Sequence, residues 1–144
     1  MAPTLEHLFV SYELALELKN IGFDEPCIRS YDNDNENSSD KKFYLFEYIS
    51  SIGITTTQLQ SNKGMENFIG APLYQQVIDW LRDEKYINIQ THYDYITYDV
   101  IIYDYKNSQT IKLQSTLMEG APYCFTDYYE ALNEAIKEAL KLIK

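Results

Sequence analysis

Apolar residues recur every three or four positions in two separate stretches of the chain, which is the pattern of an amphipathic helix. The spacing predicts one helix over Ala71–Lys85 and another over Asp127–Ile143, with Thr126 as the N-cap of the second. Both helices should bury one face, and we expect Trp80 in the core. The apolar positions are Leu73, Val77, Trp80 and Leu81 in the first helix, and Tyr128, Leu132, Ala135, Ile136, Ala139 and Ile143 in the second.

The segment between these helices alternates apolar and polar residues, which is typical of strands with one wet face. We expect three antiparallel strands, Ile87–Tyr93, Tyr98–Tyr105 and Thr110–Thr116. Turn-forming residues separate them at positions 94–97 and 106–109. The predicted order for the second half is therefore helix, three strands, helix.

The first half carries weaker signals. A short helix is predicted after Ser11, its N-cap, and it should end near Asn20 because Gly22 suits a left-handed C-terminal cap. Two strands are expected at Cys27–Tyr31 and Phe43–Ile49.

Two loops complete this half. Asp32–Lys42 is acidic but lacks the glycine and the final glutamate of an EF-hand, so we interpret it as a solvated loop. Ser50–Gly70 reads as a long connection, and the alternative is a short strand within Gly53–Leu59.

The fold class that follows is α+β. We expect a single domain over residues 1–144, in the order α-β-β-loop-α-β-β-β-α, with an antiparallel sheet packed on two helices. A chain of 144 residues has the length of one ordinary domain.

Charge narrows the possible partners. The formal net charge is −10, and binding to a nucleic-acid backbone depends on Lys and Arg, so we do not expect it. The carboxylates could instead imitate phosphates and block a host factor that binds nucleic acid. No apolar run is long enough to cross a membrane, and residues 1–7 do not resemble a signal peptide, so we expect a cytoplasmic protein. Cys27 and Cys124 are expected to be buried free thiols.

Motifs for catalysis, metals or cofactors are not recognisable. The spacings typical of metal ligands, phosphate-binding glycine loops and nucleophile elbows are missing, so we expect no cofactor and no metal. One catalytic hypothesis remains, in which His92 pairs with Asp94 or Asp99. We interpret the chain as a non-enzymatic protein.

This chain has more tyrosines than one small core can bury. Tyr93, Tyr95, Tyr98, Tyr103 and Tyr105 follow one another closely, and exposed tyrosines are enriched in protein interfaces. We therefore expect a tyrosine-rich acidic surface that contacts a protein partner or a second copy of the chain.

The alternative is a protein that binds or sequesters a small ligand of the nucleotide type. Tyrosines would then stack on a base, while Arg29, Arg82 or Lys85 would hold phosphate.

Three segments carry a resemblance, Phe9–Cys27, Ala71–Ile89 and Phe125–Ile143. The motifs in the last two are PLYQQ…WxR followed by a lysine, and EAxxxAIxxALxxI. They resemble a group of small phage- and prophage-type proteins of Bacteroidetes, to which no activity is assigned. The resemblance implies an origin in a mobile element or in its bacterial host, and it implies no activity.

The order of the second half is also similar to the double-stranded-RNA-binding domain. That family starts its second helix with lysines that contact phosphates, whereas Asp127, Tyr128, Tyr129 and Glu130 stand here. We expect a shared topology without the RNA function.

Overall fold

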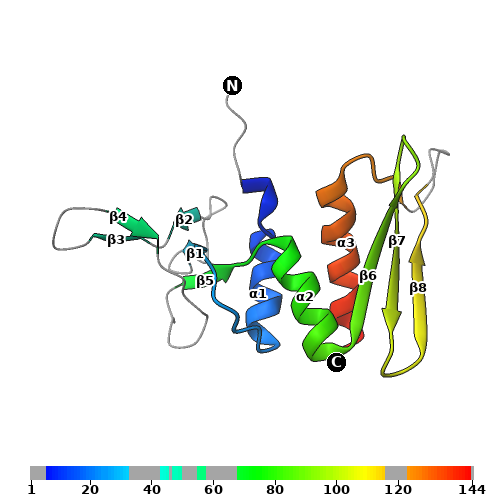
Figure 1. Ribbon diagram of the computed structural model, residues 1–144, viewed down its shortest axis with the longest axis horizontal. Helices are drawn as coiled ribbons and strands as arrows, with labels where there is room; N and C mark the ends of the chain where they lie inside the picture. The colour runs from blue at the N-terminus through cyan, green and yellow to red at the C-terminus, as the bar shows by residue number, and fades with distance from the viewer. Residues whose placement is uncertain are drawn as a thin grey trace. The chain divides into compact units, whose positions relative to one another are not determined.

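The computed structural model describes residues 6–32, 43–45, 47–49, 55–57, 68–115 and 123–143 (Figure 1). The chain divides into two compact units, residues 1–73 and residues 74–144. The architecture is α+β, as predicted. We expected both units to belong to one domain, and that stays a prediction.

The first unit holds a short 3-10 helix, η1 (Glu6–Leu8), and α1 (Tyr12–Asn20). The predicted caps of α1 are confirmed: the Ser11 hydroxyl accepts from the Leu14 amide at 3.4 Å, and Gly22 has a φ of +94°. A left-handed backbone is cheapest for glycine, so the chain can reverse there. After this turn Phe23 enters the core, where it is 1% exposed.

The strands of the first unit are short. A three-stranded antiparallel sheet has the order β2–β1–β5, formed by Phe43–Leu45, Arg29–Asp32 and Phe68–Ala71. A separate antiparallel pair joins β3 (Glu47–Ile49) to β4 (Thr55–Thr57).

These strands correct two predictions. The expected single strand Phe43–Ile49 contains two strands, which pair with different partners. The interpretation of Ser50–Gly70 as a connection is wrong because β4 and most of β5 lie within it, and the alternative strand within Gly53–Leu59 is confirmed. Strand β4 consists of three threonines, whose β-branched side chains suit a strand. Because these residues do not alternate between apolar and polar, the hydrophobic pattern alone could not identify β4. The predicted loop Asp32–Lys42 lies outside the described residues beyond Asp32, which belongs to β1.

The second unit follows the predicted order of helix, three strands and helix. Its elements are α2 (Tyr74–Lys85), β6 (Ile87–Tyr93), β7 (Tyr98–Asp104), β8 (Gln109–Leu113) and α3 (Tyr128–Lys141). The sheet is antiparallel with β7 in the centre, and both helices contact it and each other. The predicted sheet packed on two helices is thus confirmed (Figure 1).

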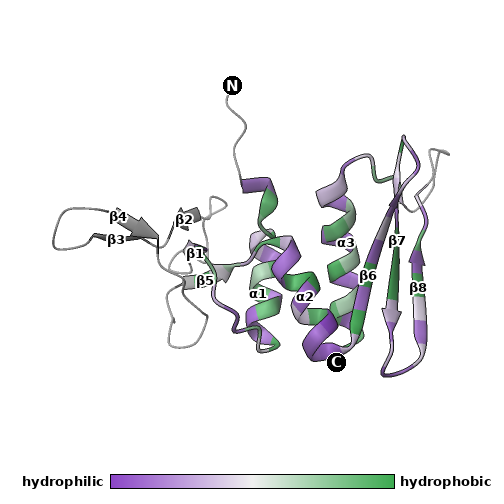
Figure 2. Cartoon of the chain, in the orientation of Figure 1, coloured by the Kyte–Doolittle hydropathy of each residue, from purple (hydrophilic) through white to green (hydrophobic). Residues whose placement is uncertain are grey.

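The core of this unit lies between the sheet and the helices. In the first half of β6 and the second half of β7 every second residue is buried, including Ile89, Val100 and Ile102. The opposing face of α3 buries Leu132 and Ile136, and Figure 2 shows green and purple stretches alternating along this helix. The apolar residues of the strands, which recur every two positions, therefore pack against those of the helices, which recur about every 3.6 positions, in one apolar layer.

Element ends differ from expectation in detail. Helix α2 starts at Tyr74, because Ala71 is the last residue of β5. The N-cap of α3 is Asp127, whose carboxylate accepts from the Glu130 amide at 2.9 Å, so the prediction of Thr126 is wrong. Both residue types are good caps, and an aspartate also interacts favourably with the helix dipole.

Trp80 lies in the core as expected, with 8% of its surface exposed. Truncation should leave a cavity, so Trp80→Ala is expected to lower the free energy of unfolding by about 3–5 kcal/mol. Denaturant titration measures this change. A loss below about 1 kcal/mol would contradict the core assignment.

Candidate functional site

The five tyrosines singled out in the sequence divide between two faces of the β6–β7–β8 sheet. Tyr93 pairs with Tyr98 across β6 and β7, on the face where Val100 and Ile102 are buried by the helices. Tyr103 stands between buried Ile102 and buried Asp104, so its side chain belongs to the opposite face. The strand register therefore does not place all five tyrosines on one continuous surface.

On the helix side, tyrosine rings form a connected series. The rings of Tyr93 and Tyr98 stack with centroids 4.6 Å apart, and Tyr95 lies 6.0 Å from Tyr93. From Tyr98 the contacts continue into α3, with 5.6 Å to Tyr128 and 5.2 Å from Tyr128 to Tyr129. Tyr129 contacts a ring of α2 at 5.8 Å. We call these six residues the tyrosine cluster: Tyr74, Tyr93, Tyr95, Tyr98, Tyr128 and Tyr129.

Exposure increases along the tyrosine cluster. Tyr74 is 7% exposed and its hydroxyl hydrogen-bonds to the Asn133 side chain at 3.1 Å, whereas Tyr93 is 51% and Tyr95 is 89% exposed. Ile96 adds an apolar side chain that is 61% exposed. The cluster is thus anchored in the core and open at its outer end.

A tight turn holds the exposed end in place. The Asp94 carboxylate accepts from the amides of Thr97 at 2.8 Å and Ile96 at 3.1 Å. The hydrogen bonds from Thr97 and then Ile96 lower the pKa of Asp94. Within this turn Tyr95 has a φ of +77°, a left-handed conformation that costs a non-glycine residue about 1–2 kcal/mol. The backbone thus holds an exposed aromatic ring at a strained position, and such strain is concentrated at functional sites.

Tyr103 and Tyr105 form a second, smaller group, which we call the outer pair. Their rings stack at 6.0 Å with an interplanar angle of 17°. Tyr105 is 65% exposed and Tyr103 is half-buried. Because only two rings are involved, the outer pair offers much less aromatic area than the tyrosine cluster.

Backbone amides hold both carboxylates of the catalytic hypothesis. Asp94 is engaged in its own turn, and the Asp99 carboxylate accepts from the Ser115 amide at 2.7 Å. His92 is exposed, it pairs with Asp99 across β6 and β7, and it does not line the pocket described below. Both aspartates thus help to fix loops, and a catalytic role for His92 with either of them stays a hypothesis.

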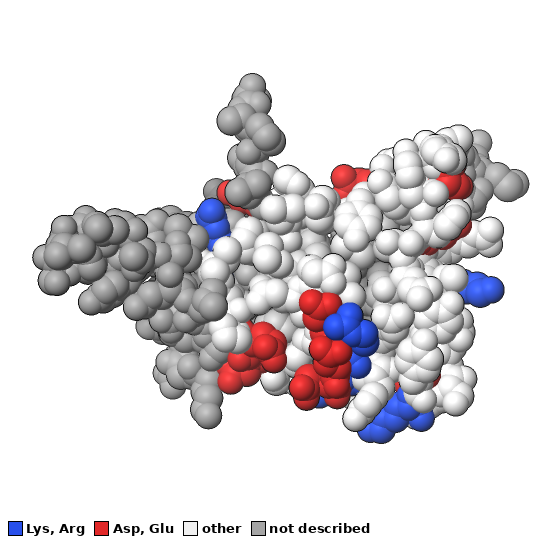
Figure 3. Space-filling model, in the orientation of Figure 1, with Lys and Arg blue, Asp and Glu red and all other residues white. Residues whose placement is uncertain are grey.

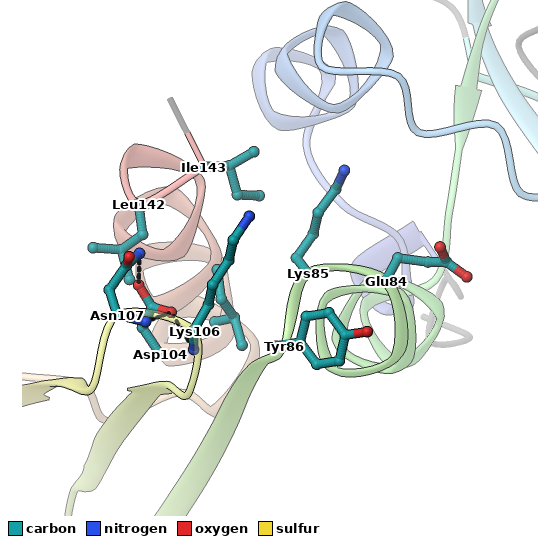
Figure 4. A pocket seen from close by; sticks show the side chains of 9 residues that line it. Glu84, Lys85, Tyr86, Asp104, Lys106, Asn107, Leu142 and Ile143 are labelled. Atoms are coloured by element: carbon teal, nitrogen blue, oxygen red, sulfur yellow. Dashed lines mark hydrogen bonds between the residues drawn. The ribbon is translucent and has the colours of Figure 1, made fainter.

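A pocket of about 410 Å³ lies in the second unit, at the end of α2 and α3 and the turn between β7 and β8 (Figure 4). Tyr86, Leu142 and Ile143 line it with apolar surface, and Lys85 and Lys106 bring two ammonium groups. Polar atoms contribute more of the lining surface than apolar atoms do, and the apolar side chains form one part of it.

Of the three basic residues expected to hold phosphate, only Lys85 lines this pocket. Arg82 is exposed and forms ion pairs with Asp83 at 2.9 Å and Asp79 at 3.1 Å. Arg29 belongs to β1 of the first unit, where its guanidinium lies 5.7 Å from the Phe9 ring. The three residues thus do not form one phosphate site within a single unit.

Sequence reasoning missed Lys106, which it treated as turn chemistry. The antiparallel register could have revealed it: Ile87, at the start of β6, pairs with Asp104, at the end of β7. Lys85 and Lys106 each lie two positions beyond this pair, so they come together at one end of the sheet.

Acidic and basic side chains lie next to each other on the face drawn in Figure 3, as they do around Arg82. Within the described ranges no three His, Cys, Asp or Glu side chains gather to hold a metal ion. No helix in this part of the chain is long and apolar enough to cross a membrane.

Comparison with family models, with curated proteins and with solved structures found no match for this chain. The resemblance to phage- and prophage-type proteins therefore stays a prediction.

The two cysteines differ in accessibility. Cys27 is buried, as expected, but Cys124 is exposed, which corrects the expectation for this residue. Burial raises the pKa of the Cys27 thiol to about 12, and the negative charges of Glu25 and Asp24 add to this effect. Thiolate is the reactive form, so Cys27 should be inert near neutral pH.

We expect an alkylating reagent at about pH 8 to modify Cys124 and to spare Cys27 until the protein unfolds. Mass spectrometry after proteolysis counts the label at each site, and Cys124→Ser is the control that removes the fast reaction. Equal labelling rates at the two thiols in the folded protein would contradict this assignment.

The buried thiol also makes stability depend on pH. The folded pKa of Cys27 lies above its ordinary value of 9.0, so the buried thiol favours the folded state below pH 9. That contribution should be lost as the pH rises toward 12.

Proposed function

We propose that this chain is a non-enzymatic accessory protein of the phage or mobile-element type, which acts in the cytoplasm by binding a protein partner through its tyrosine cluster. The observation that carries the proposal is the connected series of six rings, anchored at Tyr74 and open at Tyr95. Residues that dominate protein interfaces are large, rigid and partly held in place before binding. The tyrosine cluster meets each of these conditions.

Preorganisation favours binding because little side-chain entropy remains to be lost. The Tyr93 hydroxyl donates to the Tyr95 carbonyl at 2.9 Å, and the Tyr93 ring stacks on Tyr98. These contacts fix the rings that a partner would meet.

The charges around the tyrosine cluster indicate which partner surface it would fit. The two segments that carry the exposed rings, residues 93–98 and 126–133, contain Asp94, Asp127 and Glu130 and no Lys or Arg. Aromatic faces and carboxylates both attract cations, guanidinium groups above all. We therefore propose a partner surface rich in arginine.

Loss of the exposed rings should abolish partner binding without unfolding the protein. We expect Tyr93→Ala combined with Tyr95→Ala to lose the proteins that the immobilised wild-type chain retains from a bacterial lysate, because these two side chains are 51% and 89% exposed. Quantitative mass spectrometry of the retained proteins measures the loss. A self-association would be seen instead as a dimer in sedimentation analysis that the double variant lacks.

The matched control is Tyr103→Ala combined with Tyr105→Ala, which removes two tyrosines from the other face. It should retain the same proteins as the wild type, and both double variants should melt cooperatively. Equal retention by all three chains would contradict the proposal, as would a loss of binding that follows the outer pair.

A further inference from the structure

We propose that the pocket at the other end of the second unit binds a small organic monoanion, a carboxylate or phosphate monoester attached to an apolar or aromatic body. The pocket is separate from the tyrosine cluster and shares no residue with it. It lies where α2 and α3 end, whereas the tyrosine cluster lies where β7 and α3 begin.

Two lysines supply the positive charge. Figure 4 shows the side chains of Lys85 and Lys106, which both line the pocket, extending in the same direction. Among the described residues neither ammonium group is in an ion pair, although the Lys85 ammonium lies over the Trp80 ring, 5.1 Å from its centroid. In contrast, Lys137 and Lys141 each pair with a glutamate three positions earlier. Lys85 and Lys106 come from a helix and from a turn, so only the fold brings them together.

The acidic residues of the lining leave room for an anion. The Asp104 carboxylate is 3% exposed and accepts from the amides of Lys106 and Asn107, both at 3.1 Å. It accepts a third hydrogen bond from the Asn107 side chain at 2.8 Å. The Glu84 side chain points away from the pocket in Figure 4. Asp104 therefore shapes the turn that presents Lys106, and its buried charge limits the ligand to a single negative group.

The helix ends oppose further negative charge. Helices α2 and α3 both terminate at this end of the unit, and the C-terminus of a helix carries partial negative charge. Together with the buried Asp104 carboxylate, this disfavours a polyphosphate such as a nucleoside triphosphate.

The apolar side chains that line the pocket fit the apolar part of such a ligand. Leu142 and Ile143 are half-buried, and the Tyr86 side chain is 61% exposed beside them. Tyr86 has a φ of +59°, a second left-handed tyrosine at a candidate site. Its position is fixed by the Tyr105 amide, which donates to the Tyr86 carbonyl at 3.0 Å. A ring or short alkyl chain could lie on this surface while its charged group meets the lysines.

The test is an NMR titration of the full chain with four probes: phenylacetate, phenyl phosphate, inorganic phosphate and the neutral phenylacetamide. Phenylacetate or phenyl phosphate should shift the amides of Lys106, Asn107 and Leu142 saturably, with a dissociation constant on the order of 1 mM. The comparison of the two anions tells which charged group the site prefers. Inorganic phosphate and phenylacetamide should bind more weakly, since each lacks one half of the recognised chemistry.

Variants separate the pocket from general charge effects. Lys85→Met and Lys106→Met should each weaken binding roughly fivefold, and Lys112→Met, a matched change on the outer face of β8, should leave it unchanged. The proposal would be overturned by an absence of saturable shifts at about 10 mM of either anion, by equal binding of phenylacetamide, or by an equal effect of Lys112→Met. Failure here would not affect the tyrosine proposal, which rests on other residues.

Discussion

The burial of one face of the β6–β7–β8 sheet beneath α2 and α3 is the constraint on which the rest of the second unit depends. Side chains of a strand alternate between faces, so the buried positions Ile89, Val100 and Ile102 decide where every other residue points. Tyr93 and Tyr98 share their face, and Tyr103 does not. A shift of one residue in the register would exchange the tyrosines of the two faces.

The same order of elements creates two ends with different chemistry. At one end, the turn after β6 and the start of α3 gather aromatic rings and carboxylates. At the other, the final turns of α2 and α3 meet the β7–β8 turn, where two lysines and apolar side chains surround a pocket. A tyrosine with a left-handed backbone conformation lies at each end, Tyr95 at the first and Tyr86 at the second. Each is a place where the chain keeps a large side chain in spite of backbone strain.

Much of this fold could be predicted because its long elements carry strong periodic patterns. Residue spacing predicts α2, α3 and, with turn-forming residues, the three strands between them, while the cap residues Ser11 and Gly22 help to predict α1. Strand β4 is only an alternative in the prediction, because three threonines give no alternation between apolar and polar residues. The choice of Asp127 over Thr126 as a cap depends on local geometry that neighbouring, equally suitable residues do not reveal.

The candidate sites were harder to predict than the fold, because they depend on pairing between strands. The sequence drew attention to the correct residue type, tyrosine, yet grouped five residues that the register separates. It also missed that Tyr128 contacts Tyr98 and that Tyr129 contacts Tyr128, since contacts between a helix and a strand cannot be read from spacing. The basic residues predicted to hold phosphate depend on neighbours that the sequence does not show. Arg82, for example, forms ion pairs with two aspartates.

The central claim is that the buried sheet face orders one connected set of tyrosine rings. Solution NMR with ring-labelled tyrosine tests it most directly, through nuclear Overhauser effects between assigned rings. Cross-peaks should connect Tyr93 with Tyr98 and Tyr98 with Tyr128, whose ring centroids lie 4.6 and 5.6 Å apart. An absence of cross-peaks between Tyr93 and Tyr98, or between Tyr98 and Tyr128, would contradict the account.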